Sequence, residues 1–163
     1  MDFPDGKINF RIALHEPEIP ANTGNIGRLC VGANSELHII KPMRFFLTDK
    51  YLKRAGLDYW KKLKLHFHEN LAEFLQAFPA NSIYFCTTKS KNVYSDFQFK
   101  KGDIFLFGAE SKGLPETLLN KFPEKTITIP MTKDIRSINL SNCVAIMLYE
   151  AWRQHNWSEG GNI

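Results

Sequence analysis

The chain has 163 residues, of which 44% are hydrophobic and 23% charged, and its net charge is +4. This length suits one hydrophobic core, so we expect a single domain over 1–163. No apolar stretch approaches the roughly 20 residues of a bilayer span, and the first residues lack the features of a secretory signal. We therefore exclude an integral membrane protein and expect a cytoplasmic location. The small positive charge permits a polyanionic partner but does not prove one.

Strands and helices are expected to alternate along the whole chain. In chain order, we expect a strand at 8–15, a helix from Asn22 or Thr23 to Asn34, a strand at 37–40, a helix near Leu52, a short segment at 63–67, a helix at 70–77, strands at 82–87 and 103–107, a helix at 115–121, a strand at 126–129 and a last helix at 140–154. Apolar periodicity, turn residues and capping residues carry these assignments.

This alternation predicts an α/β fold with a mostly parallel sheet and helices on both faces. The last helix is apolar nearly all round, because Val144, Met147 and Leu148 lie on one stripe while Ile146 and Tyr149 lie on the other side. Such a helix is buried on two faces. Its second face packs either in the core or against a second subunit of a two-fold dimer.

Cysteines and histidines give little sign of a metal site. Cys30, Cys86 and Cys143 lie more than fifty residues apart, which is typical of reduced thiols in a core. Among the five histidines, only His66 and His68 form a close pair in the sequence, and on a strand they share a face. No third ligand is evident near them in the sequence, so we expect no metal.

Common cofactor and catalytic signatures are missing from the sequence. No GxGxxG follows the first strand, no GxxxxGK[ST] occurs, and there is no GxSxG elbow. A Rossmann dinucleotide site, a P-loop and a serine hydrolase site are therefore disfavoured.

Three clusters of small, polar and helix-starting residues do stand out. They are PANTGNIGR at 20–28, FGAESKGLP at 107–115, and IPM followed by SINLSN between 129 and 142. Each cluster comes directly after an expected strand. Ligands of open α/β sheets bind beyond the carboxyl ends of the strands, so the three clusters are expected to converge on one site.

The three clusters resemble, in order and spacing, the signature motifs of the SPOUT superfamily of methyltransferases. Within it, HEPEIPANTGNIGRLC, RAGLDY, TTK, LFGAESKGLP, IPM, RSINLSN and YEAWRQ are similar to the small family that methylates the wobble nucleotide of transfer RNA leucine isoacceptors. The resemblance runs from about residue 8 to 154. It implies a C-terminal deep trefoil knot at about 82–154, without a separate RNA-binding domain.

The resemblance also implies the reaction and the partners. S-adenosylmethionine would methylate the ribose 2′-oxygen of nucleotide 34, a cytidine or carboxymethylaminomethyluridine, in the anticodon stem-loop of tRNA, without a metal. A homodimer would form through the C-terminal helix and the knot face. The alternatives are a 2′-O-methyltransferase acting on another tRNA or rRNA site, a non-catalytic RNA-binding knotted protein, and an adenosine-nucleotide binding module.

Carried over by motif, the cofactor pocket would be lined by Cys86, Gly108, Glu110, Gly113, Ile129, Met131, Ser137 and Leu140. Glycines suit close approach of the backbone to a ligand. Glu110 would lie near positively charged parts of the ligand, or is an ordinary exposed carboxylate. Two departures from the family are visible: Ala109 replaces a proline, and Ser35 with Glu36 replace a glycine and a basic or aromatic residue. We expect these to alter only local geometry.

For catalysis, the resemblance points to Arg28, which would orient the ribose and stabilise charge because an arginine stays protonated. Asn22 would brace the same loop. Ser141 and Asn142 would orient the ribose or cap the last helix.

RNA binding is expected of Lys50, Lys53, Arg54 and Tyr59 in the basic, aromatic segment 50–64, extended by Arg153. The alternative for this segment is a solvated face with core aromatics.

Overall fold

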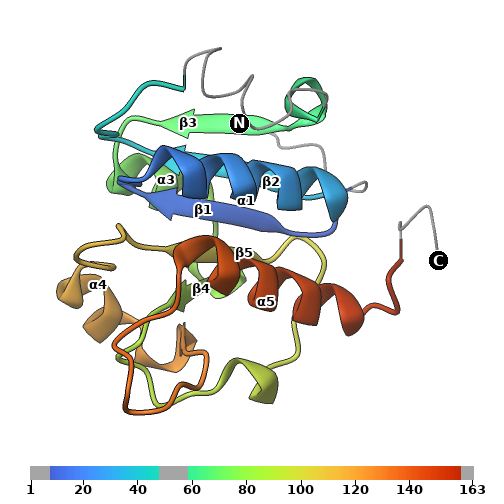
Figure 1. Cartoon of the computed structure of the whole chain (residues 1–163). Coiled ribbons are helices and arrows are strands. Elements are labelled where there is room, and N and C mark those ends of the chain that lie inside the picture. Colours follow the sequence, from blue (N-terminus) through green and yellow to red (C-terminus); the bar gives the residue numbers. More distant parts are fainter. Residues whose placement is uncertain (1–7, 48–58, 159–163) are drawn as a thin grey trace.

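The computed structural model describes residues 8–47 and 59–158. It contains one six-stranded sheet, in the order β3-β2-β1-β5-β4-β6, in which all neighbouring strands run parallel (Figure 1). The strands are β1 (Arg11–His15), β2 (Glu36–Ile40), β3 (Leu65–His68), β4 (Ile83–Cys86), β5 (Ile104–Phe107) and β6 (Thr126–Ile127). The predicted α/β class is confirmed.

Four helices cover the two faces of the sheet in the described part of the chain. They are α1 (Pro20–Gly32), α3 (Leu71–Ala77), α4 (Glu116–Lys121) and α5 (Leu140–Arg153), with short 3-10 turns such as Trp60–Lys62 between elements. Helices α1 and α5 lie side by side on one face, as Figure 1 shows, while α3 and α4 lie on the other. No helix among the described residues is long and apolar enough to cross a membrane.

Each face of the sheet carries its own hydrophobic core. Phe10 and Phe105 pack with Val144 on the α1 and α5 side, whereas Phe74 packs with Phe85 on the α3 and α4 side. A strand covered on both faces has no polar face to present. The continuous apolar strand at 104–107 therefore lies in the middle of the sheet with all four residues buried.

Helix α1 begins earlier than the sequence indicated. Its first residue is Pro20, its N-cap is Ile19, and no side chain caps it. Proline fits the first helical turn because its missing N–H would have no intrahelical partner there. The prediction that Asn22 or Thr23 caps this helix is therefore wrong. The side chain of Asn22 makes other contacts instead, which are described below. The helix expected near Leu52 lies outside the described residues.

Helix α5 buries one stripe, which includes Val144, Met147 and Trp152, against the sheet and α1. Its other side is only partly covered: Tyr149 is 39% exposed and Ile146 is half-buried. The single chain thus leaves part of the second apolar face of this helix open.

The strand register decides where the loops gather. Leu14 pairs with Phe107, Phe107 with Cys86, and Cys86 with Ile127. The segments that follow these residues therefore leave the sheet at one edge, which is the carboxyl edge where α/β folds place ligands.

Candidate active site

A cavity of about 450 Å³ opens at this carboxyl edge. Its walls come from the ends of β4, β5 and β6, the loops after them, and the start of α5. All eight residues expected to bind the cofactor line it: Cys86, Gly108, Glu110, Gly113, Ile129, Met131, Ser137 and Leu140. The sequence reasoning thus predicted residues that the fold brings together, although they span 55 positions of the chain.

The wall at 108–113 is a tight backbone loop that requires glycine. A Cβ added to Gly108 would lie 2.0 Å from the carbonyl carbon of Gly113, a contact that no side chain adjustment relieves because both partners are backbone. Gly113 itself has a φ of +67°, where glycine is favoured. Its N–H donates to the carbonyl of Ala109 at 2.8 Å, and this bond closes the loop.

Three side chains join the three sequence clusters by hydrogen bonds. Asn22 Nδ2 donates to Glu110 Oε1 at 3.1 Å, and Asn139 Nδ2 donates to Asn22 Oδ1 at 3.0 Å. Glu110 also accepts from the backbone N–H groups of Glu18 and Ile19, at 2.8 and 3.1 Å. These carboxylate bonds hold the start of α1 against the loop after β5. We call Asn22, Glu110 and Asn139 the polar brace.

This geometry gives Glu110 a role that neither sequence reading anticipated. It lines the cavity, but both of its oxygens accept hydrogen bonds from α1 and the segment before it. Asn22 also lines the cavity, and its side-chain amide bonds to both Glu110 and Asn139. The carboxylate therefore positions the wall of the cavity through Asn22 and the backbone.

Asn139 lines the cavity, and the sequence analysis assigned it no role. It is the N-cap of α5, where its Oδ1 accepts from Ser141 N at 2.9 Å and from Ser141 Oγ at 2.7 Å. An asparagine directly before an apolar helix is a capping signal that the sequence offered. The expectation that Ser141 or Asn142 caps the helix is therefore corrected. Neither lines the cavity, and Asn142 is exposed on the first turn.

Arg28 does not line the cavity. It is exposed on α1, six residues after Asn22, which is about 9 Å along the helix axis. Its guanidinium lies over the ring of Tyr59, 5.2 Å from the ring centroid. The Tyr59 hydroxyl donates to the carbonyl of Gly24 at 2.9 Å, so Tyr59 contacts α1 at two points.

The expected RNA-binding residues are only partly described. Lys50, Lys53 and Arg54 lie outside the described residues. Trp60 packs against α1, where its ring would be 3.1 Å from a Cβ on Gly27, so this aromatic side chain is structural. Arg153 is exposed and donates to both oxygens of Glu150, at the end of α5 opposite Asn139.

Two thiols form part of the cavity wall. Cys86 and Cys143 both line it, and burial raises the pKa of each thiol. Both are therefore protonated near neutral pH and offer polarisable apolar surface rather than a nucleophile. Together with Ile129 and Leu140, they give the cavity an apolar wall beside the exposed backbone of the 108–113 loop.

Comparison with known proteins identifies the family. Residues 9–149 match the SpoU rRNA Methylase family. The chain belongs to this family. The SpoU fold carries a trefoil knot, so the fold that the sequence motifs implied is confirmed.

Two relatives match this chain over almost their full length. The tRNA (cytidine(34)-2'-O)-methyltransferase of Methylovorus glucosotrophus is 47% identical over 150 residues, which cover 91% of this chain and 97% of the relative. The enzyme of the same name from Escherichia coli K12 is 47% identical over 144 residues, covering 88% and 92%.

Solved structures agree with this assignment. One, described as giving structural insights into the 2-OH methylation of C/U34 on tRNA, is 40% identical, with a TM-score of 0.84 and coverage of 91% of this chain and 97% of the other. A second, the SpoU methyltransferase AviRb of Streptomyces viridochromogenes in complex with AdoMet, shares the fold at 22% identity, with a TM-score of 0.78 and coverage of 94% and 60%.

Ser35 and Glu36, which depart from the family pattern, are buried and contact residues of other segments of the chain. Ser35 is buried, and its Oγ accepts from the N–H of Phe10 at 3.3 Å. Glu36 is 1% exposed and begins β2. Its carboxylate meets Arg11 and two histidines inside the protein, so the expectation of a purely local effect is corrected.

Proposed function

We propose that this chain transfers a methyl group from S-adenosylmethionine to the ribose 2′-oxygen of nucleotide 34 of tRNA. The observation that carries the proposal is the cavity at the carboxyl edge, which is lined by all eight expected cofactor residues and held by the polar brace between the three motif clusters. The names of relatives 47% identical to this chain support the same reaction and the same nucleotide. The finer substrate proposed is the wobble cytidine or carboxymethylaminomethyluridine of leucine tRNAs.

The residues present fit S-adenosylmethionine. The cavity volume lies within the range of small-molecule sites, and such sites combine apolar walls with a few polar groups. Apolar groups of Ile129, Met131 and Leu140 would hold the adenine, while the loop around Gly108 would offer backbone groups. When bound, the cofactor supplies an electrophilic methyl group. SpoU relatives bind the same molecule, as the AviRb complex illustrates.

The side chains of this protein would place the nucleophile and stabilise its charge. A ribose hydroxyl is weakly acidic, so its attack on the methyl carbon requires orientation and loss of its proton to water, while the bond from methyl to sulfur breaks and S-adenosylhomocysteine leaves. Arg28 would bind the substrate near the reacting ribose and stabilise the developing negative charge, because a guanidinium cannot act as a base at neutral pH. Asn22 would act as a positioning residue through the polar brace. Ser141 would support the same end of α5 through Asn139.

The partners proposed are the anticodon stem-loop of tRNA and a second copy of the chain. Lys50, Lys53, Arg54 and Arg153 would neutralise phosphates, and Tyr59 would join this surface beside Arg28. The incompletely covered side of α5, with Ile146 and Tyr149, would form the core of the dimer contact together with the knot face.

A methyl-transfer assay tests the proposal. Purified protein is incubated with labelled S-adenosylmethionine and tRNA from a strain that lacks wobble 2′-O-methylation, and the label is mapped by nuclease digestion and mass spectrometry. We expect label on the ribose of nucleotide 34, lost in Arg28→Ala and retained in Lys121→Ala, which removes an exposed positive charge outside the cavity. Label at another tRNA or rRNA position would replace the proposed substrate. Cofactor binding without transfer to any RNA would favour a non-catalytic RNA-binding protein.

A further inference from the structure

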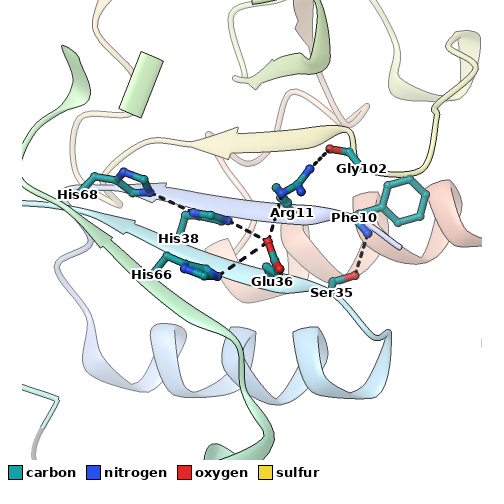
Figure 2. A network of polar contacts seen from close by, with 8 residues as sticks. All are labelled: Phe10, Arg11, Ser35, Glu36, His38, His66, His68 and Gly102. Carbon is teal, nitrogen blue, oxygen red and sulfur yellow. Dashed lines mark hydrogen bonds and ion pairs between the residues drawn. The ribbon is translucent and has the colours of Figure 1, made fainter. Parts of the chain in front are cut away.

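A cluster of polar side chains is buried between β2 and its edge neighbour β3. Glu36 is the first residue of β2, and His38 follows on the same face of that strand. His66 lies across from His38 on β3, because the two residues are register partners. Figure 2 shows the carboxylate of Glu36 pointing toward both imidazoles. We call Glu36, His38 and His66 the edge cluster.

The edge cluster brings three metal-ligating atoms close together. Glu36 Oε2 lies 3.5 Å from His38 Nε2 and 3.9 Å from His66 Nε2, and the three ligand atoms lie within 4.8 Å of one another. Zinc binds nitrogen and oxygen ligands at about 2.0–2.2 Å, which places tetrahedral ligand atoms roughly 3.3 Å apart. These separations exceed the spacing of a tetrahedral zinc site by about 1.5 Å or less, so a local rearrangement of the side chains would bring the atoms to that spacing.

We propose that Glu36, His38 and His66 form a binding site for a divalent metal ion of borderline softness, and that the ion bound there is Zn²⁺. Two imidazoles and one carboxylate are a set that zinc uses with a fourth, open position. The fourth position would take water from the side of His66, whose side chain is 31% exposed, whereas His38 is fully buried.

Neighbouring groups support the first two ligands. His38 Nδ1 forms a 3.0 Å hydrogen bond with His68 Nε2, and such a contact behind a metal ligand fixes the orientation of its ring. Arg11 Nε donates to Glu36 Oε2 at 3.1 Å and thereby holds the carboxylate in place. A carboxylate has several lone pairs, so the contact with Arg11 leaves acceptor capacity for an ion.

One movement is required for binding. The rings of His38 and His66 are stacked, with centroids 4.6 Å apart and planes 18° from parallel. An ion coordinated by imidazole lies in the plane of the ring, so it cannot lie in the planes of two stacked rings at once. The ring of His66 must therefore turn toward the ion. Its place on the edge strand and its partial exposure leave room for that rotation.

The proposed ion would have a structural role that is separate from methyl transfer. Among the described residues, those of the edge cluster do not line the cavity at the carboxyl edge. An ion held by β2 and β3 would instead link the edge strand to the rest of the sheet. An ion that binds the folded state but not the unfolded state raises the free energy of unfolding, so zinc should stabilise the protein.

The test measures zinc uptake by tag-free protein that has first been stripped with a chelator. We expect one Zn²⁺ per chain in equilibrium dialysis and a rise in Tm on zinc addition. His66→Gln should weaken zinc binding at least tenfold and abolish the rise in Tm. His155→Gln is the matched control, because His155 is another partly buried histidine outside the edge cluster, and it should bind zinc as the wild type does.

Two further measurements keep the result interpretable. Circular dichroism of metal-free His66→Gln shows whether it is folded, and His66→Asn serves as a second variant if it is not. Substitution with Co²⁺ should give visible ligand-field bands without the charge-transfer band of a thiolate, which separates this site from Cys86 and Cys143. Stoichiometric uptake unchanged in both His66 variants, a thiolate band, or no uptake by the wild type would each overturn the proposal.

Discussion

Replacement of Gly108 by alanine is the most direct test of the cavity wall. The added Cβ would lie 2.0 Å from Gly113 C, 2.2 Å from Leu114 N and 2.4 Å from Gly113 O. An ordinary contact begins near 3.4 Å, so the two backbone segments must separate by more than 1 Å. Overpacking of this kind costs about 1–3 kcal/mol in stability. It also moves the backbone that is proposed to hold the adenosine.

We therefore expect Gly108→Ala to bind S-adenosylmethionine at least tenfold more weakly, which corresponds to about 1.4 kcal/mol or more. Isothermal titration calorimetry measures the affinity, and urea unfolding measures the stability. Gly32→Ala is the matched control, because its added Cβ meets only the Tyr149 hydroxyl at 3.8 Å, an ordinary contact. If Gly108→Ala bound the cofactor as tightly as the wild type, the loop at 108–113 would not be part of the cofactor site.

Three other predictions concern the polar brace, Tyr59 and acid pH. Asn139→Ala removes the helix cap and should lower the free energy of unfolding by about 1 kcal/mol. Asn139→Asp keeps the acceptor for the cap but loses the donor to Asn22. It should therefore weaken cofactor binding in calorimetry, with a smaller loss of stability in urea unfolding. Tyr59→Phe should keep the methyl-transfer rate, because the ring beside Arg28 remains, while Tyr59→Leu should lower kcat; equal rates for both variants would contradict a positioning role. Burial lowers the pKa of His38 from 6.5 to about 4, so the neutral ring contributes stability that is full above pH 6.5 and is lost as the pH falls toward 4. Urea unfolding should show a loss of about 2 kcal/mol from this group between pH 7 and pH 5, and a flat profile would refute the buried neutral ring.

The sequence predicted the parts of the fold that depend on local patterns. The apolar strand at 104–107 and the buried stripe of α5 follow from composition and periodicity, which the sheet preserves because both of its faces are covered. The sequence analysis placed the start of α1 at a polar capping residue, whereas the helix begins at Pro20 without a side-chain cap. Local rules rank alternatives of this kind but do not decide between them.

The site divides in the same way. The residues on the cavity wall were predicted from the resemblance of their motifs to a known family. They meet in the fold because each motif follows a strand that ends at the same edge of the sheet. The brace from Asn139 to Asn22 spans 117 positions, and nothing in either local sequence indicates the pairing. Glu36 was missed for a related reason: its neighbours Arg11 and His66 come from two other strands, so its burial depends on the order of the sheet.

The N-cap of α5 has a consequence for how the protein is made. Asn139 and the residues after it complete the cavity, yet they are synthesised more than a hundred residues after Asn22. A nascent chain that has folded its first strands still lacks one wall of the pocket. Cofactor affinity should therefore arise in one late step, when the final helix docks, so that an incomplete chain on the ribosome does not compete for methyl donor.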